Sequence, residues 1–421
     1  MSELVNDPAS NAATLPPCRS CGREGLRRFL DLGSTPLSDA LVPRDRLDGP
    51  EERFPLEVAF CPSCSLVQIT EEVSAKRLFV DNYLYFSSFS DQLLRHSREH
   101  ALNLMRTRDL GRQSLVVELA SNDGYSLRNF VEAGVPALGI EPSPAPADAA
   151  EAIGVPTMRE FFGSELAEKL RSDGQVADVI IANNVMAHVP DLNSFVAGMA
   201  TLLADDGLIT VENPYVRDLV QHGEFDTIYH EHFCYYSCTS VQHLVKRHGL
   251  FLNHVEYFPD LHGGTLRWHL SKRNSPTVEV GRYLAAERAI GLDQFEYYAA
   301  FGEQVRAIRT QLLDLLRGFR DDGATIAGYG AAAKGSTLLN YVGIDAGLLE
   351  FVVDRNVHKQ GLHMSGTHQP ILDPAALLER RPNYVLLLAW NFAEEIRRQQ
   401  AEYVRQGGRF IVPIPVPEVL P

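Results

Sequence analysis

The chain of 421 residues is short of positive charge: 39 Lys and Arg side chains stand against 54 Asp and Glu, a net charge of −15. Without a basic field to attract phosphates, we expect neither nucleic acid nor an anionic membrane as a partner. No run of about 18 apolar residues occurs, so no membrane span is expected. The N-terminus lacks the basic and apolar regions of a secretory signal, which favours a cytoplasmic protein.

Two phosphate-binding fingerprints are also missing. Neither G-x-G-x-x-G nor G-x-x-x-x-G-K-[ST] is present, and these patterns bring backbone close to a pyrophosphate or triphosphate. A nicotinamide-dependent oxidoreductase is therefore disfavoured. Any nucleoside held by the first α/β unit described below is expected to be free of phosphate.

Cysteine is scarce, yet four of the six cysteines form two C-x-x-C pairs, Cys18/Cys21 and Cys61/Cys64. Each pair can offer two thiolates from one tight turn, and two such pairs complete a closed, tetrahedral zinc site. We therefore predict a small zinc-binding module over residues 1–80 in a reducing compartment, with four unmetallated thiols as the alternative.

The segment Ser114–Gly124, S-L-V-V-E-L-A-S-N-D-G, is typical of a strand that runs into a turn and a helix. This unit leaves backbone N–H groups free to hold a ligand. A second strand ends at Glu141, close to the spacing of about 20 residues at which doubly wound sheets place a ribose-binding acid. A third strand ends in Asn183 and Asn184. We predict a doubly wound α/β domain at 81–255 that binds a nucleoside, the alternative being a similar domain with another nucleoside or none.

Other polar side chains are expected over the same crevice because they follow strand ends. His188 follows the third strand, and Glu212 follows the strand at 208–211. Upstream, residues 78–90 place Tyr83, Tyr85 and Ser88 just ahead of a helix. This stretch is either a connector whose aromatic rings pack between domains or a lid over the nucleoside.

The richest polar segment is residues 224–237, E-F-D-T-I-Y-H-E-H-F-C-Y-Y-S. Its core is a run from Tyr229 through His230 and Glu231 to His232. Aromatic surroundings and a neighbouring carboxylate tune an imidazole into a general base that works near neutral pH. A metal site built from His230 and His232 is the alternative, although no third ligand is evident.

A second α/β unit is predicted over residues 256–421. It contains His262-Gly263-Gly264, a long helical region and the strand–turn–helix T-I-A-G-Y-G-A-A-A-K-G-S-T. The glycines of this turn, with Lys334 at the helix start and Lys359 after the next strand, can bind a phosphate or pyrophosphate. The alternative is a glycine-rich packing turn.

Taken together, these motifs resemble the nucleotide-linked deoxysugar C-methyltransferases, zinc-containing enzymes that use S-adenosylmethionine. The resemblance covers nearly the whole chain: the four-cysteine module with D-L-G-x-x-P-L-S-D, then Y-x-Y-x-S-S, E-x-x-x-N-D-G, N-x-x-x-H-V-P, F-D-x-I-Y-x-E-H-F, H-G-G and G-Y-G-A-x-A-K. It implies a class I methyltransferase domain between the zinc module and a C-terminal Rossmann-like domain. It also implies methylation of a 4-keto-6-deoxysugar, usually dTDP-linked, most often at C-3.

The resemblance also implies roles for individual residues. The base is His232, with Tyr229 and Glu231 positioning the sugar or the imidazole, and His188 on the sugar side. The active-site tyrosine is Tyr83, with Tyr85 as second choice. Cofactor contacts fall on Glu118, Ala120 (where the family usually has glycine), Asn122, Asp123, Gly124, Glu141, Pro142, Asn183 and Asn184. Substrate contacts fall on Tyr85, Ser88, Asn184, His262, Gly263, Tyr329, Gly330, Lys334 and Lys359.

Two readings from other classes stay open at this point. One is O- or N-methylation of a small metabolite, which has less need of a buried base. The other is a non-catalytic nucleotide-sugar-binding protein with a zinc module. The sequence leaves the methylated carbon (C-3 or C-5), the nucleobase and the oligomeric state undecided.

Overall fold

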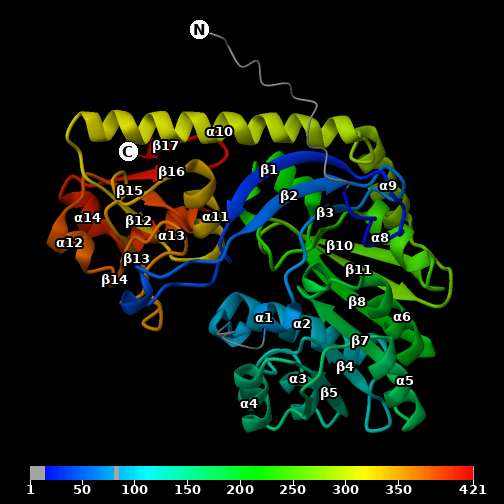
Figure 1. The fold of residues 1–421 in the computed structure, drawn as a ribbon. Helices are drawn as coiled ribbons and strands as arrows, with labels where there is room; N and C mark the ends of the chain where they lie inside the picture. The colour runs from blue at the N-terminus through cyan, green and yellow to red at the C-terminus, as the bar shows by residue number, and fades with distance from the viewer. Residues whose placement is uncertain (1–14, 80–84, 421) are drawn as a thin grey trace.

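The computed structural model of the protein describes residues 15–79 and 85–420, which form three β-sheets with helices around them (Figure 1). Tyr83 lies outside the described residues. Each sheet draws most of its strands from one of the three units expected from the sequence, but two of the sheets also take a strand from a neighbouring unit.

The central sheet has the strand order β6-β5-β4-β7-β8-β11-β10. Its strands from β4 to β8 are parallel, while β11 runs antiparallel between β8 and β10. Their bounds are β4 (Val116–Leu119), β5 (Ala137–Ile140), β6 (Thr157–Met158), β7 (Ala177–Asn183), β8 (Leu203–Pro214), β10 (Phe251–Phe258) and β11 (Thr265–Ser271). The order reverses at β4, so a ligand crevice is expected above its C-terminal end.

This sheet continues beyond residue 255, where we placed the domain boundary. That position falls within β10, and β11 inserts itself between β10 and β8. The helices of this region are α2 (Asp91–Thr107), α3 (Arg128–Glu132), α4 (Pro144–Ala152), α5 (Ser164–Ser172), α6 (Leu192–Leu202), α7 (Val216–Gln221), α8 (Cys238–Lys246) and α9 (Val278–Ala289).

The N-terminal sheet is completed by a strand from far along the chain. Its order is β1 (Arg27–Thr35), β2 (Phe54–Phe60), β3 (Val67–Ile69) and β9 (Cys234–Tyr235). Strand β9 pairs antiparallel with β3, and the N–H of Ile69 donates to the carbonyl of Phe233 at 3.0 Å. The short helix α1 (Ala75–Phe79) follows this sheet. The module expected at 1–80 therefore does not close on itself.

The C-terminal sheet is doubly wound as well, in the order β14-β13-β12-β15-β16-β17. Only β17 runs antiparallel to its neighbour. The elements are β12 (Ile326–Tyr329), α11 (Ala333–Val342), β13 (Val352–Val353), β14 (Ile371–Leu372), α12 (Ala376–Arg380), β15 (Tyr384–Leu387), α13 (Ala393–Gln399), α14 (Ala401–Arg405), β16 (Arg409–Val412) and β17 (Glu418–Leu420). The order reverses between β12 and β15, which creates a second ligand-binding edge.

One long helix, α10 (Phe295–Asp321), spans the molecule. At 27 residues it is about 40 Å long, and Figure 1 shows it lying across the N-terminal sheet and reaching the C-terminal one. Its Tyr298 and Phe301 pack on Phe29 of β1, with ring centroids 5.3 and 6.4 Å apart. One apolar cluster includes residues of all three sheets, and two smaller clusters lie within the central and C-terminal units. Within residues 15–79 and 85–420, no helix combines the length and apolar character needed to cross a membrane.

We expect the packing of α10 on β1 to be sensitive to one methyl group. A Cβ on Gly302 would lie 2.3 Å from the carbonyl oxygen of Phe29, so Gly302→Ala should destabilise the protein by about 1–3 kcal/mol through overpacking. Gly318 lies in the same helix with nothing within 4 Å of its Cβ position. Gly318→Ala should therefore stabilise by up to about 1 kcal/mol. Thermal unfolding midpoints that move in the same direction for both variants would contradict this packing.

Candidate active site

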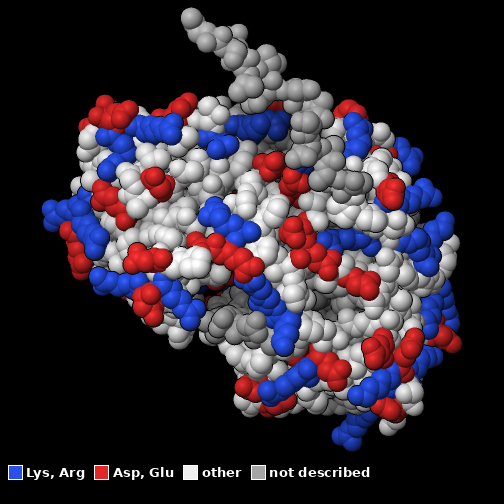
Figure 2. Space-filling view, in the orientation of Figure 1, with Lys and Arg blue, Asp and Glu red and all other residues white. Residues whose placement is uncertain are grey.

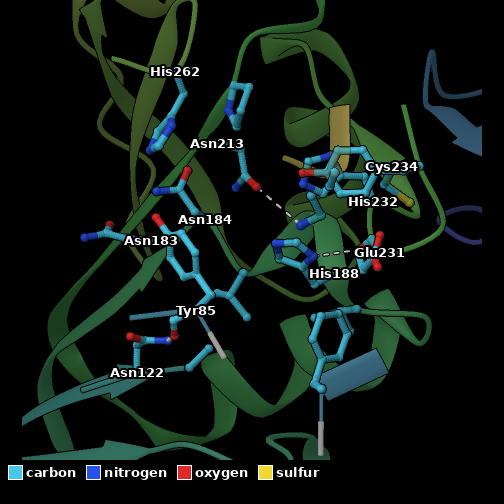
Figure 3. A pocket seen from close by; sticks show the side chains of 18 of the residues that line it. Tyr85, Asn122, Asn183, Asn184, His188, Asn213, Glu231, His232, Cys234 and His262 are labelled. Atoms are coloured by element: carbon cyan, nitrogen blue, oxygen red, sulfur yellow. Dashed lines mark hydrogen bonds between the residues drawn. The ribbon is translucent and has the colours of Figure 1, made fainter. Parts of the chain in front are cut away.

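All three units line one cavity of about 690 Å³. It lies over the C-terminal ends of the central strands (Figure 3). It also extends to the turn before α11. Of the residues proposed from the sequence, the following line it: Tyr85, Ala120, Asn122, Glu141, Pro142, Asn183, Asn184, His188, Tyr229, Glu231, His232, His262, Gly263, Lys334 and Lys359. The nucleoside crevice and the Y-H-E-H segment therefore form one site.

The turn after β4 has a backbone that most side chains avoid. Ala120 and Asn122 have φ values of +54° and +50°, a left-handed conformation that Asn tolerates and that costs Ala about 1–2 kcal/mol. The Asn122 amide then holds the segment before α2. Its Nδ2 donates to the carbonyl of Tyr85 at 3.0 Å, and its Oδ1 accepts from the N–H of Ser87 at 2.9 Å. Asp123 similarly accepts from the N–H of Ser88 at 3.0 Å.

Asn122 and Asp123 therefore position the 85–88 segment, a role that we did not anticipate for them. The cavity lining does not include Asp123, Glu118, Gly124 or Ser88. Glu118 is buried within β4, where desolvation raises its pKa well above the usual range. Gly124 is needed for packing, because a Cβ there would lie 3.0 Å from the side chain of Val155.

Glu141, at the tip of β5, presents its carboxylate at the cavity edge. Its two oxygens accept from the N–H groups of Asn122 and Ser143 at 2.9 and 2.8 Å. Burial nevertheless raises the pKa of Glu141. Each carboxylate oxygen has a second lone pair, which can accept from a ribose hydroxyl.

Two amide oxygens at the tip of β7 are left without hydrogen-bond donors in the described part of the chain. Asn183 and Asn184 line the cavity, and the Oδ1 atom of each is buried with no hydrogen-bond donor among the residues that the structure describes. Buried polar atoms are rarely left unpaired. Unpaired acceptors here suit a cationic ligand, so the crevice fits S-adenosylmethionine, whose methionine moiety carries a sulfonium and an ammonium.

The imidazoles of His188 and His232 line another side of the cavity. The Nδ1 of His232 contacts the carbonyl of Thr227 at 2.9 Å, and the Nδ1 of His188 contacts the carbonyl of Glu231 at 2.7 Å. Because a carbonyl only accepts, both Nδ1 atoms carry the proton and both Nε2 atoms keep a lone pair. The ring centroids are 4.9 Å apart. The two side chains are thus bases in their neutral form.

Burial determines the protonation states of His188, His232 and the neighbouring Glu231. It lowers the pKa of His232 to about 3, with His188 reinforcing the effect, and it lowers the pKa of His188. Burial, reinforced by the charge of Asp39, raises the pKa of Glu231 to about 8. At neutral pH the cavity therefore holds neutral bases beside a carboxylic acid that keeps its proton. The ring of Tyr229 packs on His232 with centroids 4.1 Å apart.

Glu212 does not face the cavity as we expected. Its carboxylate is buried on the opposite side of the sheet, 2.5 Å from the Nε of Arg267 and 3.0 Å from the Nε2 of His96 on α2. Neighbouring residues of a strand point to opposite faces, and the cavity is lined by Asn213 instead. The prediction was one residue out of register. The asparagine was visible in the sequence, but nothing there marked its face.

His230 also points away from the cavity, because its Nε2 donates to the carbonyl of Pro55 in β2 at 3.1 Å. The alternative metal site at His230 and His232 finds no support. In the described part of the chain, the four cysteines alone form a group of metal-binding side chains close enough to share an ion.

At the far end of the cavity, Lys334 and Lys359 come from the C-terminal unit. The Nζ of Lys334 donates to the Oδ1 of Asn391 at 2.7 Å and lies 4.3 Å from the ring centroid of Trp390. The Nζ of Lys359 donates to the carbonyl of Ala331 at 2.7 Å. Both ammonium groups stand near the N-terminus of α11, a suitable place for phosphate oxygens.

The neighbouring Tyr329 and Gly330 do not line the cavity. Tyr329 packs in the core of the C-terminal sheet. Gly330 has a φ of +99°, and a Cβ there would lie 2.8 Å from the Cβ of Ala389. The glycine-rich turn is therefore a packing turn at this position, with Lys334 as its cavity-facing residue.

In the H-G-G motif, Gly263 leaves room for the carboxyl group of Glu224, a residue that we did not predict as part of the site. A Cβ on Gly263 would lie 2.7 Å from Glu224 Oε2. Glu224 lines the cavity, and burial raises its pKa to about 7, with Lys334 opposing that effect. His262, beside it, also lines the cavity, and burial lowers its pKa.

The four cysteines form the cluster that their spacing predicts. The Sγ atoms of Cys18 and Cys64 are 3.6 Å apart, as are those of Cys21 and Cys61, and all four lie within 4.8 Å of one another. A tetrahedral zinc ion with Zn–S bonds of about 2.3 Å separates its sulfur ligands by about 3.8 Å. The donor set and its dimensions therefore fit zinc.

Strand order, crevice and donor groups together define a class I S-adenosylmethionine-dependent methyltransferase. Three family models match in succession: a zinc-binding domain (residues 18–79), a methyltransferase domain (92–255) and a C-methyltransferase C-terminal domain (260–415). The chain is 36% identical over 406 residues to C-methyltransferase NovU from Streptomyces niveus, covering 96% of each chain. The protein belongs to this family of C-methyltransferases.

Solved structures show weaker likenesses. Magnesium protoporphyrin IX methyltransferase (ChlM) from Synechocystis PCC 6803, with bound SAH, matches with a TM-score of 0.36 and 13% identity, covering 47% of this chain and 92% of that one. The YcgJ protein of a Bacillus species matches with a TM-score of 0.34 and 13% identity, covering 42% and 100%. The fold assignment here depends on strand order and the family models.

Removing one thiolate should disrupt the metal cluster. We expect Cys61→Ser to lose zinc and to lower the thermal midpoint and the soluble yield, because the three remaining ligands no longer close the site. Cys238→Ser, at a buried cysteine outside the cluster, should keep the zinc content of the wild type. Metal analysis of both proteins checks this, and undiminished zinc in Cys61→Ser would contradict the four-cysteine assignment.

Proposed function

We propose that the protein transfers a methyl group from S-adenosylmethionine to carbon, most specifically C-3, of a dTDP-linked 4-keto-6-deoxysugar. The observation that carries this proposal is the pair of neutral imidazoles. Their lone pairs face a cavity shared by the nucleoside crevice and the C-terminal ligand-binding edge. Methylation at carbon needs a base that removes a C–H proton, whereas O- or N-methylation has less need of one.

In the proposed reaction the ketone acidifies the neighbouring C–H bond, and the Nε2 of His232 takes the proton. The Nδ1–H bond to Thr227 fixes the ring for this task. The sugar is left as an enolate whose carbon is nucleophilic. S-adenosylmethionine, when bound, supplies an electrophilic methyl group.

Electrostatics decide whether His232 is basic enough. Burial, reinforced by His188, lowers its pKa to about 3, which describes a weak base. Substrate oxygens that become negative beside the ring favour the imidazolium form and raise that pKa. The proton is therefore best held by His232 when the enolate forms next to it, as an ion pair.

The zinc module and the C-terminal unit serve as support and recognition in this proposal. Lys334, Lys359 and the first turn of α11 hold the diphosphate, while Glu141 and the crevice hold the nucleoside of the cofactor. Figure 2 shows charges of both signs interspersed over one face of the molecule, so the lysines act as local contacts within the cavity. We assign zinc binding to residues 1–80, methyl transfer to the central unit that begins at residue 81 and continues past residue 255 through β10 and β11, and nucleotide-sugar recognition to the rest of residues 256–421.

Mass spectrometry of a panel of nucleotide-linked 4-keto-6-deoxysugars tests the proposal. Incubation with the protein and S-adenosylmethionine should add one methyl mass to the sugar. Exchange of the adjacent C–H in deuterated water should identify carbon as the acceptor. Methyl transfer without such exchange would favour oxygen or nitrogen as acceptor, and cofactor binding without any methylated sugar would refute the substrate class.

His232→Asn should slow methylation by at least about 100-fold, the lower range for losing a general base. Binding of S-adenosylmethionine should stay unchanged, because the imidazole lies on the substrate side of the cavity. His243→Asn, at an exposed histidine of α8, is the matched control and should keep wild-type turnover. Near-normal turnover of His232→Asn would show that another residue is the base, and His188 would be the first candidate.

The protonation state of Glu231 should set an upper pH limit for turnover. Its carboxyl group is neutral below a pKa of about 8 and becomes a carboxylate above it, where its charge repels a forming enolate. Turnover of the wild type should therefore fall above about pH 8. Glu231→Gln offers an amide N–H at every pH, so the variant should lose this fall. The same fall in both proteins would show that another group causes it.

A further inference from the structure

The side chain of Asn213 is anchored at one end and unpaired at the other. It lies at the C-terminal end of β8, is 1% exposed and lines the cavity. Its Oδ1 accepts from the N–H of Ala187 at 3.3 Å, beside His188. Its Nδ2 is buried and has no acceptor in the part of the chain that the structure describes.

The hydrogen bond from the N–H of Ala187 to Oδ1 fixes the orientation of the Asn213 amide. With the amide reversed, the NH₂ group would oppose the N–H of Ala187, leaving two buried donors face to face. A buried donor without an acceptor costs about 1–3 kcal/mol, so the observed orientation is strongly preferred. Asn213 therefore offers the cavity N–H donors and no acceptor.

The Asn213 amide is a hydrogen-bond donor whose neighbours in the cavity present mainly hydrogen-bond acceptors. In Figure 3, Asn213 lies between the asparagines Asn183 and Asn184 on one side and the imidazoles of His188 and His232 on the other. Both imidazoles present lone pairs, because their Nδ1–H groups are already committed to carbonyls. A base needs such lone pairs, but they cannot stabilise a negative oxygen.

We propose that the amide nitrogen of Asn213 donates a hydrogen bond to the ketone oxygen of the substrate as that oxygen becomes an enolate. The inference rests on the proposed function and adds a catalytic residue to it. In this step the C–H bond breaks, its proton goes to the Nε2 of His232, and its electron pair moves into the enolate, with the negative charge on oxygen. A preorganised donor aimed at such an oxygen contributes about 10²–10³ in rate.

The amide differs from the protonated carboxyl of Glu231, another candidate donor in the cavity, in one measurable respect. Glu231 donates only while it keeps its proton, whereas an amide N–H does not titrate. The contribution of Asn213 should therefore be the same at every pH. Asn213→Asp retains the oxygen that anchors Ala187 and makes the inward group titratable, so it separates donation from structural support.

The experiment measures exchange of the C–H next to the ketone in deuterated water, with S-adenosylhomocysteine bound so that no methyl transfer follows. The wild type should exchange readily. Asn213→Asp should exchange about 10²–10³-fold more slowly at pH 8, where its carboxylate cannot donate. It should recover toward the wild-type rate at pH 5.5 as the buried carboxyl regains a proton, and S-adenosylhomocysteine should bind within threefold of the wild-type affinity.

Two further variants keep the test decisive. Asn103→Asp, on α2 and outside the cavity, keeps the side-chain oxygen that accepts from Arg106 and should exchange like the wild type. Asn213→Ser replaces Asn213→Asp if the latter does not fold, and it should exchange at least tenfold more slowly at both pH values. Exchange within threefold of wild type in a folded Asn213 variant, or a loss in Asn213→Asp that does not recover at low pH, overturns the inference. Absence of exchange in the wild type overturns the proposed function itself.

Discussion

The pairing of β9 with β3 is the constraint on which the site depends. It makes the residues directly after His232 an extra strand of the zinc module. The guanidinium of Arg19, within the first cysteine knuckle, lies 5.0 Å from the ring centroid of Phe233. The carbonyls of Arg19 and Ser20 accept from the Nδ2 of Asn193, at the start of α6. The four-cysteine cluster, its first knuckle, Phe233 and the segment that carries His232 thus form one continuous chain of contacts, so a metal ion held by the cysteines would support the cavity wall without touching it.

The chemistry of the cavity has a single electrostatic origin. Removal from water penalises every charged form, so it keeps the proton on Glu231 and off His232. One cause thereby produces an acid and a base side by side at the same pH. The zinc module contributes here too, because Asp39 lines the cavity and its charge helps Glu231 to retain the proton.

Much of this could be predicted because the decisive signals are local. Cysteine spacing gives the metal cluster, and the polar residues that end buried strands mark the crevice. What could not be predicted depends on contacts between distant segments or on strand register. A shift of one residue exchanges the faces of Glu212 and Asn213. Asn122 carries the family's cofactor signature, yet its amide is occupied by backbone groups of residues 85–88. We predicted Tyr329 and Gly330 as ligand contacts. Close packing explains both instead, because Gly330 lies against Ala389 and Tyr329 is buried in the C-terminal core.

The remote origin of β9 also has a consequence for how the chain assembles during synthesis. When residues 18–69 leave the ribosome, cysteines and strands β1 to β3 are in place, but the outer edge of β3 has no neighbour until residue 235 has been made. An unpaired edge is a template for pairing with other chains. The zinc module therefore keeps one open edge through translation of most of the central domain. Until residue 235 is available, the open edge of β3 leaves the nascent chain exposed to pairing with a wrong strand.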